Sequence, residues 1–231
     1  MNKMVIFDLD GTLLNTIQDL TNSVNYCMKK YGGPVYTCEE IREKVGNNFP
    51  ERSLAEVRTF VGNGIRLLIE RSVPEGTSKE LIDKTFECFK TYYAVHCNDK
   101  TKTYPGVMDM LKELKKNGYK IAVLSNKAQY AVTKLCDIYF NNLLDDAVGA
   151  RENVAKKPSP DALYICAENN NINLNNVIYV GDSDVDVATA NNAGVRGIAV
   201  TWGFRSRELL IKCGAENLAD NTDELLQILL K

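Results

Sequence analysis

The sequence predicts an α/β fold: a doubly wound parallel sheet into which a helical segment is inserted. Three observations predict it. Short, wholly apolar runs, which are typical of strands buried on both faces, recur along the chain. After residue 100 these runs alternate with helical patterns, as expected of parallel strands joined by crossover helices. Between about residues 16 and 100, in contrast, the patterns are helical and no convincing strand occurs.

The first expected strand is Met4–Phe7, a continuous apolar run that stops at an Asp-Leu-Asp-Gly-Thr turn. Four more strands are expected at residues 121–124, around 147–149, at 177–180 and at 197–200. Helices are expected between them at residues 107–116, 129–137, 161–169 and 184–192. This alternation indicates one sheet with helices on both faces.

The segment after the first strand has a different character. Gly, Pro and Asn breaks separate expected helices at residues 17–30, 38–45, 53–60, 65–73 and 79–94. The simplest topology inserts these helices into the loop that follows the first strand. We therefore expect a core domain of residues 1–15 and 101–231 and a helical domain of residues 16–100.

Composition excludes several classes of protein. The 231 residues are 45% hydrophobic and 25% charged, and the net charge of −2 is unlike that of a nucleic-acid binder. The apolar runs are too short to span a membrane, and Asp8 and Asp10 interrupt the one apolar stretch where a signal peptide would lie. Seven scattered cysteines and a single histidine argue against a structural zinc site. We expect a cytoplasmic protein with reduced thiols, a monomer or homodimer that binds neither nucleic acid nor membrane.

Four groups of polar residues are candidates for chemistry, and three of them lie where expected strands end. In the first, Asp8 and Asp10 can face one crevice, while Gly11 lets the backbone turn sharply. A simple capping turn would explain Asp10 and Gly11, but it would not explain Asp8 at the strand end. Because ligands of open α/β sheets bind at the carboxyl ends of strands, this pair is a candidate for catalysis.

The other three groups are weaker when taken alone. Ser125 and Asn126 offer a hydroxyl and a backbone N–H after the second strand, although such residues are commonly helix caps. Lys157 precedes a proline that favours an extended backbone, suited to a side chain reaching into a cleft. Asp182 ends the fourth strand and Asp186 follows one helical turn later, where acidic residues also complement a helix dipole.

Together the groups predict a site for Mg²⁺ and a phosphate. Asp8, Asp10 and Asp182 supply the oxygen ligands that Mg²⁺ prefers, and a cation would relieve the repulsion among them. Lys157 adds positive charge for a dianion, and with Ser125 and backbone N–H groups it would stabilise the transferring phosphoryl group. One carboxylate can attack phosphorus to form an aspartyl phosphate, and its neighbour can protonate the leaving alkoxide and later deprotonate water.

In this order, spanning residues 8 to 186, the four groups resemble the motifs of the haloacid dehalogenase-like superfamily. The resemblance implies a Rossmann-like core with strand order 5-4-1-2-3 and a helical cap that closes over the substrate. It implies that Asp8 is the nucleophile and Asp10 the general acid and base. It further implies phosphate binding by Ser125, Asn126 and Lys157, metal binding by Asp8, Asp10 and Asp182, and support of the site by Asp186.

The resemblance also favours a phosphate ester as substrate. The dehalogenases and phosphonatases of this family lack the second aspartate, which is present here as Asp10. Its sugar-phosphate mutases use a cap histidine, whereas His96 lies at the far edge of the insert. Residues 60–66, 104–107 and 157–161 resemble the phosphoglycolate phosphatase-like branch, and Asn15 departs from it where many relatives have aspartate.

Within the cap, we expect Gly62, Asn63, Gly64 and Arg66 to form a loop that faces the active site. The alternative is a plain turn between helices followed by an exposed arginine, since Asn-Gly is primarily a turn dipeptide.

The expected function is thus that of a Mg²⁺-dependent phosphatase acting on a small phosphate monoester, most simply one like phosphoglycolate. A first alternative is the same chemistry on a nucleoside monophosphate, a sugar phosphate or pyrophosphate, because the cap chooses the substrate. A second is a signalling receiver domain, which also carries a phosphorylated aspartate on a doubly wound sheet. The long insert and the Asp-x-Asp-Gly-Thr spacing disfavour that reading.

Overall fold

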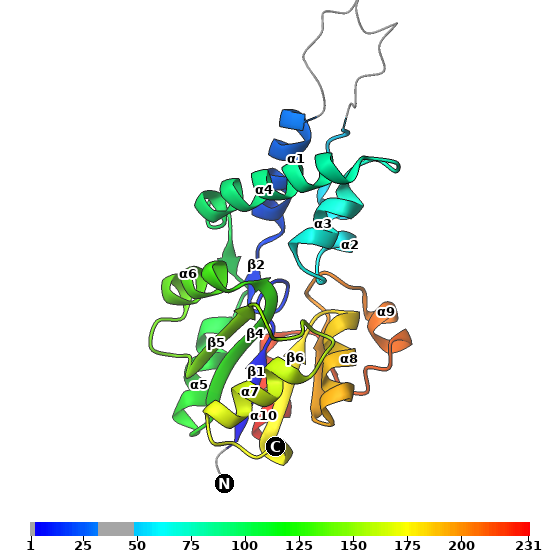
Figure 1. The fold of residues 1–231 in the computed structure, drawn as a ribbon. Helices are drawn as coiled ribbons and strands as arrows, with labels where there is room; N and C mark the ends of the chain where they lie inside the picture. Colours follow the sequence, from blue (N-terminus) through cyan, green and yellow to red (C-terminus); the bar gives the residue numbers. More distant parts are fainter. Residues whose placement is uncertain (1–2, 32–48) are drawn as a thin grey trace, which may run out of the picture. The chain divides into compact units, whose positions relative to one another are not determined.

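A computed structural model describes residues 3–31 and 49–231 (Figure 1). The helix expected at residues 38–45 lies outside these residues. The chain divides into two compact units. The sheet unit consists of Met1–Thr16, Gly62–Gly64 and Lys102–Lys231, and the helical unit consists of Ile17–Val61 and Ile65–Thr101.

The sheet unit is built on a six-stranded parallel sheet in the order β5-β4-β1-β6-β7-β8. The strands are β1 Met4–Phe7, β4 Lys120–Ala128, β5 Asp146–Ala150, β6 Val177–Gly181, β7 Arg196–Val200 and β8 Leu218–Ala219. The five expected strands take the order 5-4-1-2-3, which confirms the predicted fold class. The difference is β8, a two-residue strand at the edge beside β7, too short to show as a pattern in the sequence.

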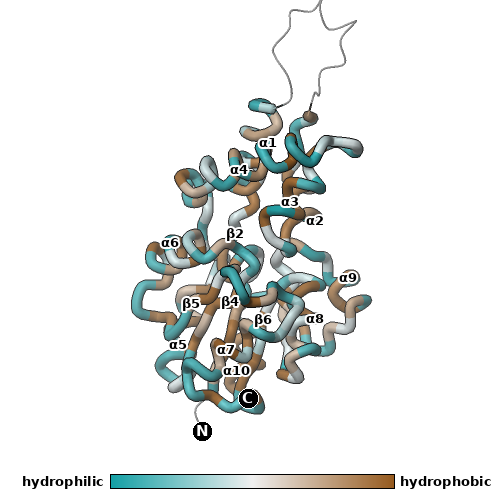
Figure 2. Tube along the Cα trace, in the orientation of Figure 1, coloured by the Kyte–Doolittle hydropathy of each residue, from teal (hydrophilic) through white to brown (hydrophobic). Residues whose placement is uncertain are grey.

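Helices surround this sheet, as Figure 1 shows. They are α5 Val107–Lys116, α6 Gln129–Tyr139, α7 Asp161–Asn169, α8 Asp184–Ala193, α9 Arg207–Lys212 and α10 Thr222–Leu230, with a short 3₁₀ turn at Leu174–Asn176. One apolar cluster joins alternate strand residues such as Met4 and Ile6 to α7 and α8 through Leu163 and Ala190. Figure 2 shows the strands as predominantly apolar segments, as burial on both faces requires.

One expected boundary is wrong. The sequence suggests that the second strand ends before Ser125, but β4 continues to Ala128, and Ser125, Asn126 and Lys127 are all buried. The pairing of β4 with β5 shifts register between Leu124 and Ala128. Such an irregularity lets polar residues continue a strand and re-aims their side chains.

The helical unit contains α1 Ile17–Tyr31, α2 Leu54–Phe60, α3 Ile65–Ser72 and α4 Lys79–His96. The first of these packs against α2 and α4, and α3 packs against α2 and α4. Two serines start helices here: Ser53 forms a capping box with Glu56, and Ser78 accepts a hydrogen bond from the backbone of Leu81.

A small ladder lies where the chain leaves the sheet unit and returns to it. Strand β2, Leu14–Asn15, pairs antiparallel with β3, Lys102–Thr103. The two ends of the inserted segment are therefore neighbours in space. No helix within the described residues has the length and apolar character needed to cross a bilayer.

Candidate active site

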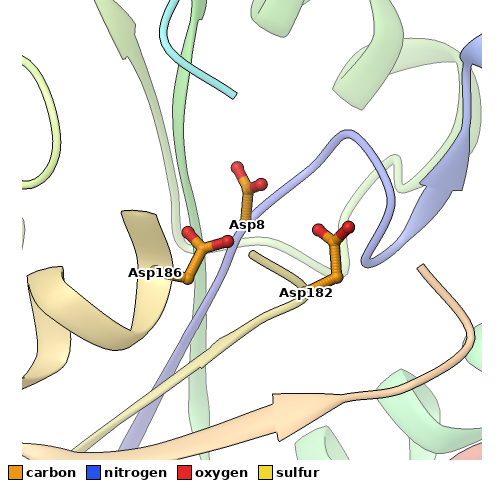
Figure 3. A group of neighbouring side chains, drawn as sticks. All are labelled: Asp8, Asp182 and Asp186. Atoms are coloured by element: carbon orange, nitrogen blue, oxygen red, sulfur yellow. The ribbon is translucent and has the colours of Figure 1, made fainter. Parts of the chain in front are cut away.

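Three aspartates form a buried cluster at one edge of the sheet (Figure 3). Asp8, Asp182 and Asp186 each offer a carboxylate oxygen, and these oxygens lie within 4.8 Å of one another. Asp8 follows β1 and Asp182 follows β6, and these strands are parallel neighbours. Their carboxyl ends therefore meet at one edge. The chain order of the strands reverses between them, which is where open α/β sheets bind ligands.

Asp8 Oδ1 is buried, and it has an ion pair but no well-directed hydrogen bond within the described residues. Lys157 Nζ lies 2.8 Å from its Oδ1, an ion pair between side chains that are 3% and 10% exposed. Even so, Oδ1 accepts no well-directed hydrogen bond from any residue that the structure describes. Burial raises the pKa of Asp8 to about 7, although Lys157 opposes this shift.

The Asp182 carboxylate is hydrogen-bonded on both oxygens and closely surrounded by backbone. Its Oδ1 accepts a hydrogen bond from Thr12 Oγ1 at 3.0 Å, and its Oδ2 accepts one from the backbone N–H of Phe204 at 2.7 Å. A Cβ at Gly11 or Gly203 would collide with this carboxylate. Burial, followed by the charges of the neighbouring aspartates, raises the pKa of Asp182 well above its usual range.

Lys157 stands at the centre of a polar network. Its Nζ lies 2.7 Å from Asp186 Oδ1 and 3.0 Å from the Tyr179 hydroxyl, which itself donates to Asp186 Oδ1 at 2.9 Å. Burial alone would lower the lysine's pKa, but the charges of Asp186 and Asp8 outweigh it and raise that pKa well above normal. The pKa of Asp186 is lowered, because Lys157 and hydrogen bonds from Ser183 and Tyr179 outweigh the effect of its burial.

The Asn126 side chain makes hydrogen bonds to the backbone of Lys157. Its Nδ2 donates to the Lys157 carbonyl at 3.0 Å and to the Gly62 carbonyl at 2.9 Å, and its Oδ1 accepts from the Lys157 backbone N–H at 2.9 Å. Ser125 Oγ accepts a weaker bond from the backbone N–H of Lys127 at 3.3 Å. The amide of Asn126 is thus committed to the backbone, which leaves the Ser125 hydroxyl as the polar side chain of this pair that can turn toward a phosphate.

Asp10 is not part of the three-aspartate cluster. Both of its carboxylate oxygens accept hydrogen bonds from Lys127 Nζ, each at 2.9 Å. Of the three expected metal ligands, the structure thus brings the carboxylates of Asp8 and Asp182 together and places that of Asp10 on a lysine.

The residues expected in a cap loop divide between the two units. Gly62, Asn63 and Gly64 cluster with the sheet unit, and both glycines have positive φ angles, of +118° and +87°. Arg66 begins α3 in the helical unit, where its guanidinium pairs with Glu70 at 2.6 Å and also with Asp83. The Arg66 guanidinium thus pairs within the helical unit, and the expectation that this loop faces the active site stays a prediction.

The aspartate cluster fits a hard divalent cation. Apart from its ion pair with Lys157, the buried Oδ1 of Asp8 accepts no well-directed hydrogen bond from the described residues, and the pKa values of Asp8 and Asp182 are raised, a shift that a cation would reverse. Oxygen donors of this kind suit Mg²⁺. The Asp186 carboxylate already accepts hydrogen bonds from Lys157, Tyr179 and Ser183. Asp8 and Asp182 are therefore the carboxylates that would hold the ion.

Four residues of the site were not anticipated: Thr12, Lys127, Tyr179 and Phe204. Thr12 follows directly on the Asp-Leu-Asp-Gly run, so its proximity could have suggested a role. Lys127 lay beyond the expected end of its strand, and Tyr179 resembled an ordinary core residue within an apolar run. Phe204 donates through its backbone N–H, so the type of its side chain gives no indication of the contact.

Comparison with known proteins agrees with this geometry. A family described as haloacid dehalogenase-like hydrolase matches residues 5–200. The chain therefore belongs to the haloacid dehalogenase-like hydrolases, as its four motifs predict.

Individual relatives resemble the chain over nearly its whole length. Phosphoglycolate phosphatase 1 of Pseudomonas aeruginosa is 30% identical over 97% of this chain and 78% of its own. Phosphoglycolate phosphatase of Psychrobacter arcticus is 30% identical over 99% and 96%, respectively. A crystal structure from Lactobacillus delbrueckii subsp. bulgaricus, provisionally named phosphoglycolate phosphatase, superimposes with a TM-score of 0.85 at 31% identity and covers 99% of both chains.

Proposed function

We propose that this chain is a Mg²⁺-dependent phosphatase that hydrolyses a small phosphate monoester through an aspartyl phosphate on Asp8. The observation that carries the proposal is the buried pair of Asp8 and Lys157 beside Asp182, with an Asp8 oxygen that accepts no well-directed hydrogen bond from the described residues. A nucleophile needs an oxygen that hydrogen bonds do not fully engage, and a dianionic phosphate needs the positive charge around it.

The positions of the residues support the following reaction. An oxygen of Asp8 attacks phosphorus while the bond from phosphorus to the ester oxygen breaks. Asp10 enters this step in its protonated form and gives that proton to the departing alkoxide; the resulting carboxylate then takes a proton from the water that attacks phosphorus and frees Asp8, which restores protonated Asp10. Lys157 and the Ser125 hydroxyl hold the phosphoryl oxygens during both transfers. Asp8 and Asp182 would hold a divalent cation, which would supply further positive charge for these oxygens.

We propose 2-phosphoglycolate, the substrate in the names of the relatives described above, as the first ester to test. The likeness to those relatives supports this choice, because it extends through the inserted helices as well as the sheet unit.

Phosphate release from a panel of small esters tests both levels of the proposal. The panel should include 2-phosphoglycolate, a nucleoside monophosphate, a sugar phosphate and pyrophosphate, each with Mg²⁺ and with EDTA. We expect release that EDTA abolishes and that prefers 2-phosphoglycolate. Release from other esters instead would keep the mechanism and discard the substrate.

A pair of variants isolates the nucleophile. Asp8→Asn should abolish release, whereas Asp109→Asn, on the exposed surface of α5, should leave it unchanged. If no ester is hydrolysed but acetyl phosphate labels Asp8 stably, the chain is a receiver-like signalling protein and the proposal is wrong.

A further inference from the structure

The sheet unit contains a second buried lysine–carboxylate pair whose purpose the chemistry above leaves open. Lys127 Nζ donates to both oxygens of Asp10, each at 2.9 Å. The lysine side chain is 3% exposed and that of Asp10 is 12% exposed. A charged lysine is rarely buried without a specific partner. Here the partner is the carboxylate that we assign to proton transfer.

The course of the two strands explains how the pair meets. Strands β1 and β4 are parallel neighbours with Phe7 opposite Val123. Asp10 lies three residues beyond Phe7, and Lys127 lies four beyond Val123. The register shift between Leu124 and Ala128 falls on the segment that contains Lys127. An irregularity of this kind can re-aim a side chain, here toward the carboxyl end of β1.

The two buried lysines serve different carboxylates. Lys157 lies against Asp8 and Asp186, whereas Lys127 lies against Asp10. Lys157 lies beside the proposed nucleophile Asp8, to which the phosphoryl group is transferred. Lys127 contacts both oxygens of the proton-transfer carboxylate, so it restrains the rotation of that carboxylate about both of its side-chain torsions.

Such a restraint matters for proton transfer. A general acid must keep an oxygen within hydrogen-bonding distance of the leaving oxygen, and a misplacement of about 1 Å can cost a hundredfold in rate. Asp10 precedes Gly11, whose φ of +93° marks a sharp turn rather than a regular strand. The backbone of Asp10 makes an isolated bridge to Leu14 outside the sheet, and Lys127 holds the Asp10 carboxylate from β4.

We propose that Lys127 is a positioning residue that holds the Asp10 carboxylate where it exchanges protons with the leaving group and with water. The inference rests on the proposed phosphatase function. Lys127 acts through Asp10, so its importance should depend on how much the reaction needs Asp10.

Leaving groups of different basicity provide the test. An alkyl ester such as 2-phosphoglycolate expels an alkoxide that needs a proton, whereas p-nitrophenyl phosphate expels a stable phenolate. The quantity to compare is kcat/KM, which reports the steps up to departure of the leaving group. For Lys127→Met we expect kcat/KM to fall at least about tenfold with the alkyl ester and less than about twofold with the aryl ester.

A double-mutant cycle makes the test independent of any loss of stability. If Lys127 acts through Asp10, Lys127→Met should cost less than about twofold further in an Asp10→Asn background. Lys127→Arg, which keeps a cation able to hold both oxygens, should recover most of the alkyl-ester activity. Lys120→Met, at the amino end of the same strand where Lys120 binds the Asn170 carbonyl, should behave like the unmodified chain.

Four results would overturn the inference or the function on which it rests. Equal losses with both esters that persist in the Asp10→Asn background would show that Lys127 only maintains the fold. A rise in KM confined to esters that carry a carboxylate would show that Lys127 binds the substrate instead. If the unmodified chain releases phosphate from neither ester, the proposed function itself fails. An Asp10→Asn variant that is impaired while Lys127→Met is not would refute the role of Lys127 alone.

Discussion

Single glycines decide how closely the backbone can approach the carboxylates of this site. A Cβ on Gly11 would collide with the Asp182 side chain, and one on Gly181 would collide with Asp186. Gly11 also has a φ of +93°, a conformation that costs other residues about 1–2 kcal/mol. Gly11→Ala should therefore both strain the turn and displace a carboxylate that we assign to the metal. We expect activity at low Mg²⁺ to fall more than tenfold, measured as a Mg²⁺ titration of phosphate release.

The chain offers a matched control for that variant. Gly214 has the same φ of +93°, but a Cβ there would meet no atom within 4 Å. Gly214→Ala should lose a similar amount of conformational stability, measured by urea unfolding, while its Mg²⁺ titration stays unchanged. If the two variants give the same titration, strain in the turn rather than the position of Asp182 controls the metal site.

The buried aspartates predict a distinctive dependence of stability on pH. The pKa of Asp8 is raised from 3.8 to about 7, and that of Asp182 is raised as well. The folded chain thus binds protons that the unfolded chain releases, so without metal the free energy of unfolding should fall as pH rises from about 4 to 7. Each such group contributes a slope of at most about 1.4 kcal/mol per pH unit. Asp186 has the opposite sign, but its lowered pKa acts below pH 4.

Thermal unfolding at pH 5 and pH 8, with EDTA or with Mg²⁺, measures this effect. We expect Mg²⁺ to raise Tm more at pH 8, where the carboxylates that we assign to the ion are charged. Asp8→Asn cannot titrate at this position and should show a shallower pH dependence in EDTA. An unmodified chain whose stability in EDTA increases from pH 5 to 8 would contradict the assigned protonation states.

What the sequence reveals about single residues depends on whether a contact is local. Asp182 and Asp186 belong to one strand–helix junction, and the acidic run between residues 182 and 186 draws attention to them. Lys127 meets Asp10 across a separation of 117 residues, and no local pattern connects the two. Arg66 is a different case. Its partners Glu70 and Asp83 lie on helices of the helical unit, outside the motifs from which a role for Arg66 in the active site is predicted.

At the scale of elements, the helices and strands with strong periodicity were predictable and the short ones were not. The helix expected at residues 161–169 has the same bounds as α7. The helix expected at residues 184–192 ends one residue before the observed end of α8. The pairs β2–β3 and the edge strand β8 consist of two-residue strands, too short for any alternation to appear. The extension of β4 was missed because polar residues usually end strands, whereas here they line the site.

One buried carboxylate outside the site joins α1 to the segment that follows α4 in the helical unit. Asp19, in the first turn of α1, is 1% exposed. It accepts hydrogen bonds from the backbone N–H groups of Lys100 and Thr101 and from the Thr101 hydroxyl, at 2.8–3.0 Å. Asp19→Ala would leave these donors unpaired in the interior. We expect a loss of about 2–4 kcal/mol in the free energy of unfolding, measured in urea.

Asp99→Ala provides the comparison for this element. Asp99 lies one residue before Lys100, but it is largely exposed and pairs with His96. Its loss should change the free energy of unfolding by no more than about 0.5 kcal/mol. If both variants are equally stable, the carboxylate of Asp19 does not secure the end of the inserted segment.

At the scale of the whole molecule, the sheet unit contains every residue assigned here to catalysis. Asp8, Asp10, Lys157 and Asp182 all belong to it, as do the remaining residues of the polar network. The inserted segment begins after β2 and ends before β3, and these strands pair antiparallel with Asn15 opposite Lys102. The same ladder continues into the hydrogen bond from the Tyr104 backbone N–H to the Leu13 carbonyl at 3.2 Å. Asn15 and Lys102, the residues of the sheet unit between which the segment is inserted, are therefore already neighbours in space.

This geometry predicts that the sheet unit folds without the insert. Replacing residues 16–101 with Asn-Gly would connect Asn15 to Lys102 through a two-residue hairpin turn, which that dipeptide favours. The shortened chain loses Gly62–Gly64 and the hydrogen bond from Asn126 to the Gly62 carbonyl, so its stability should be lower. We nevertheless expect a single cooperative thermal transition, and a Tm that Mg²⁺ raises. The same shortened chain carrying Asp8→Asn should lose the response to Mg²⁺, which would localise the effect to the aspartate cluster. A product that binds hydrophobic dyes and melts without cooperativity would show that the helical unit is required for the sheet unit to fold.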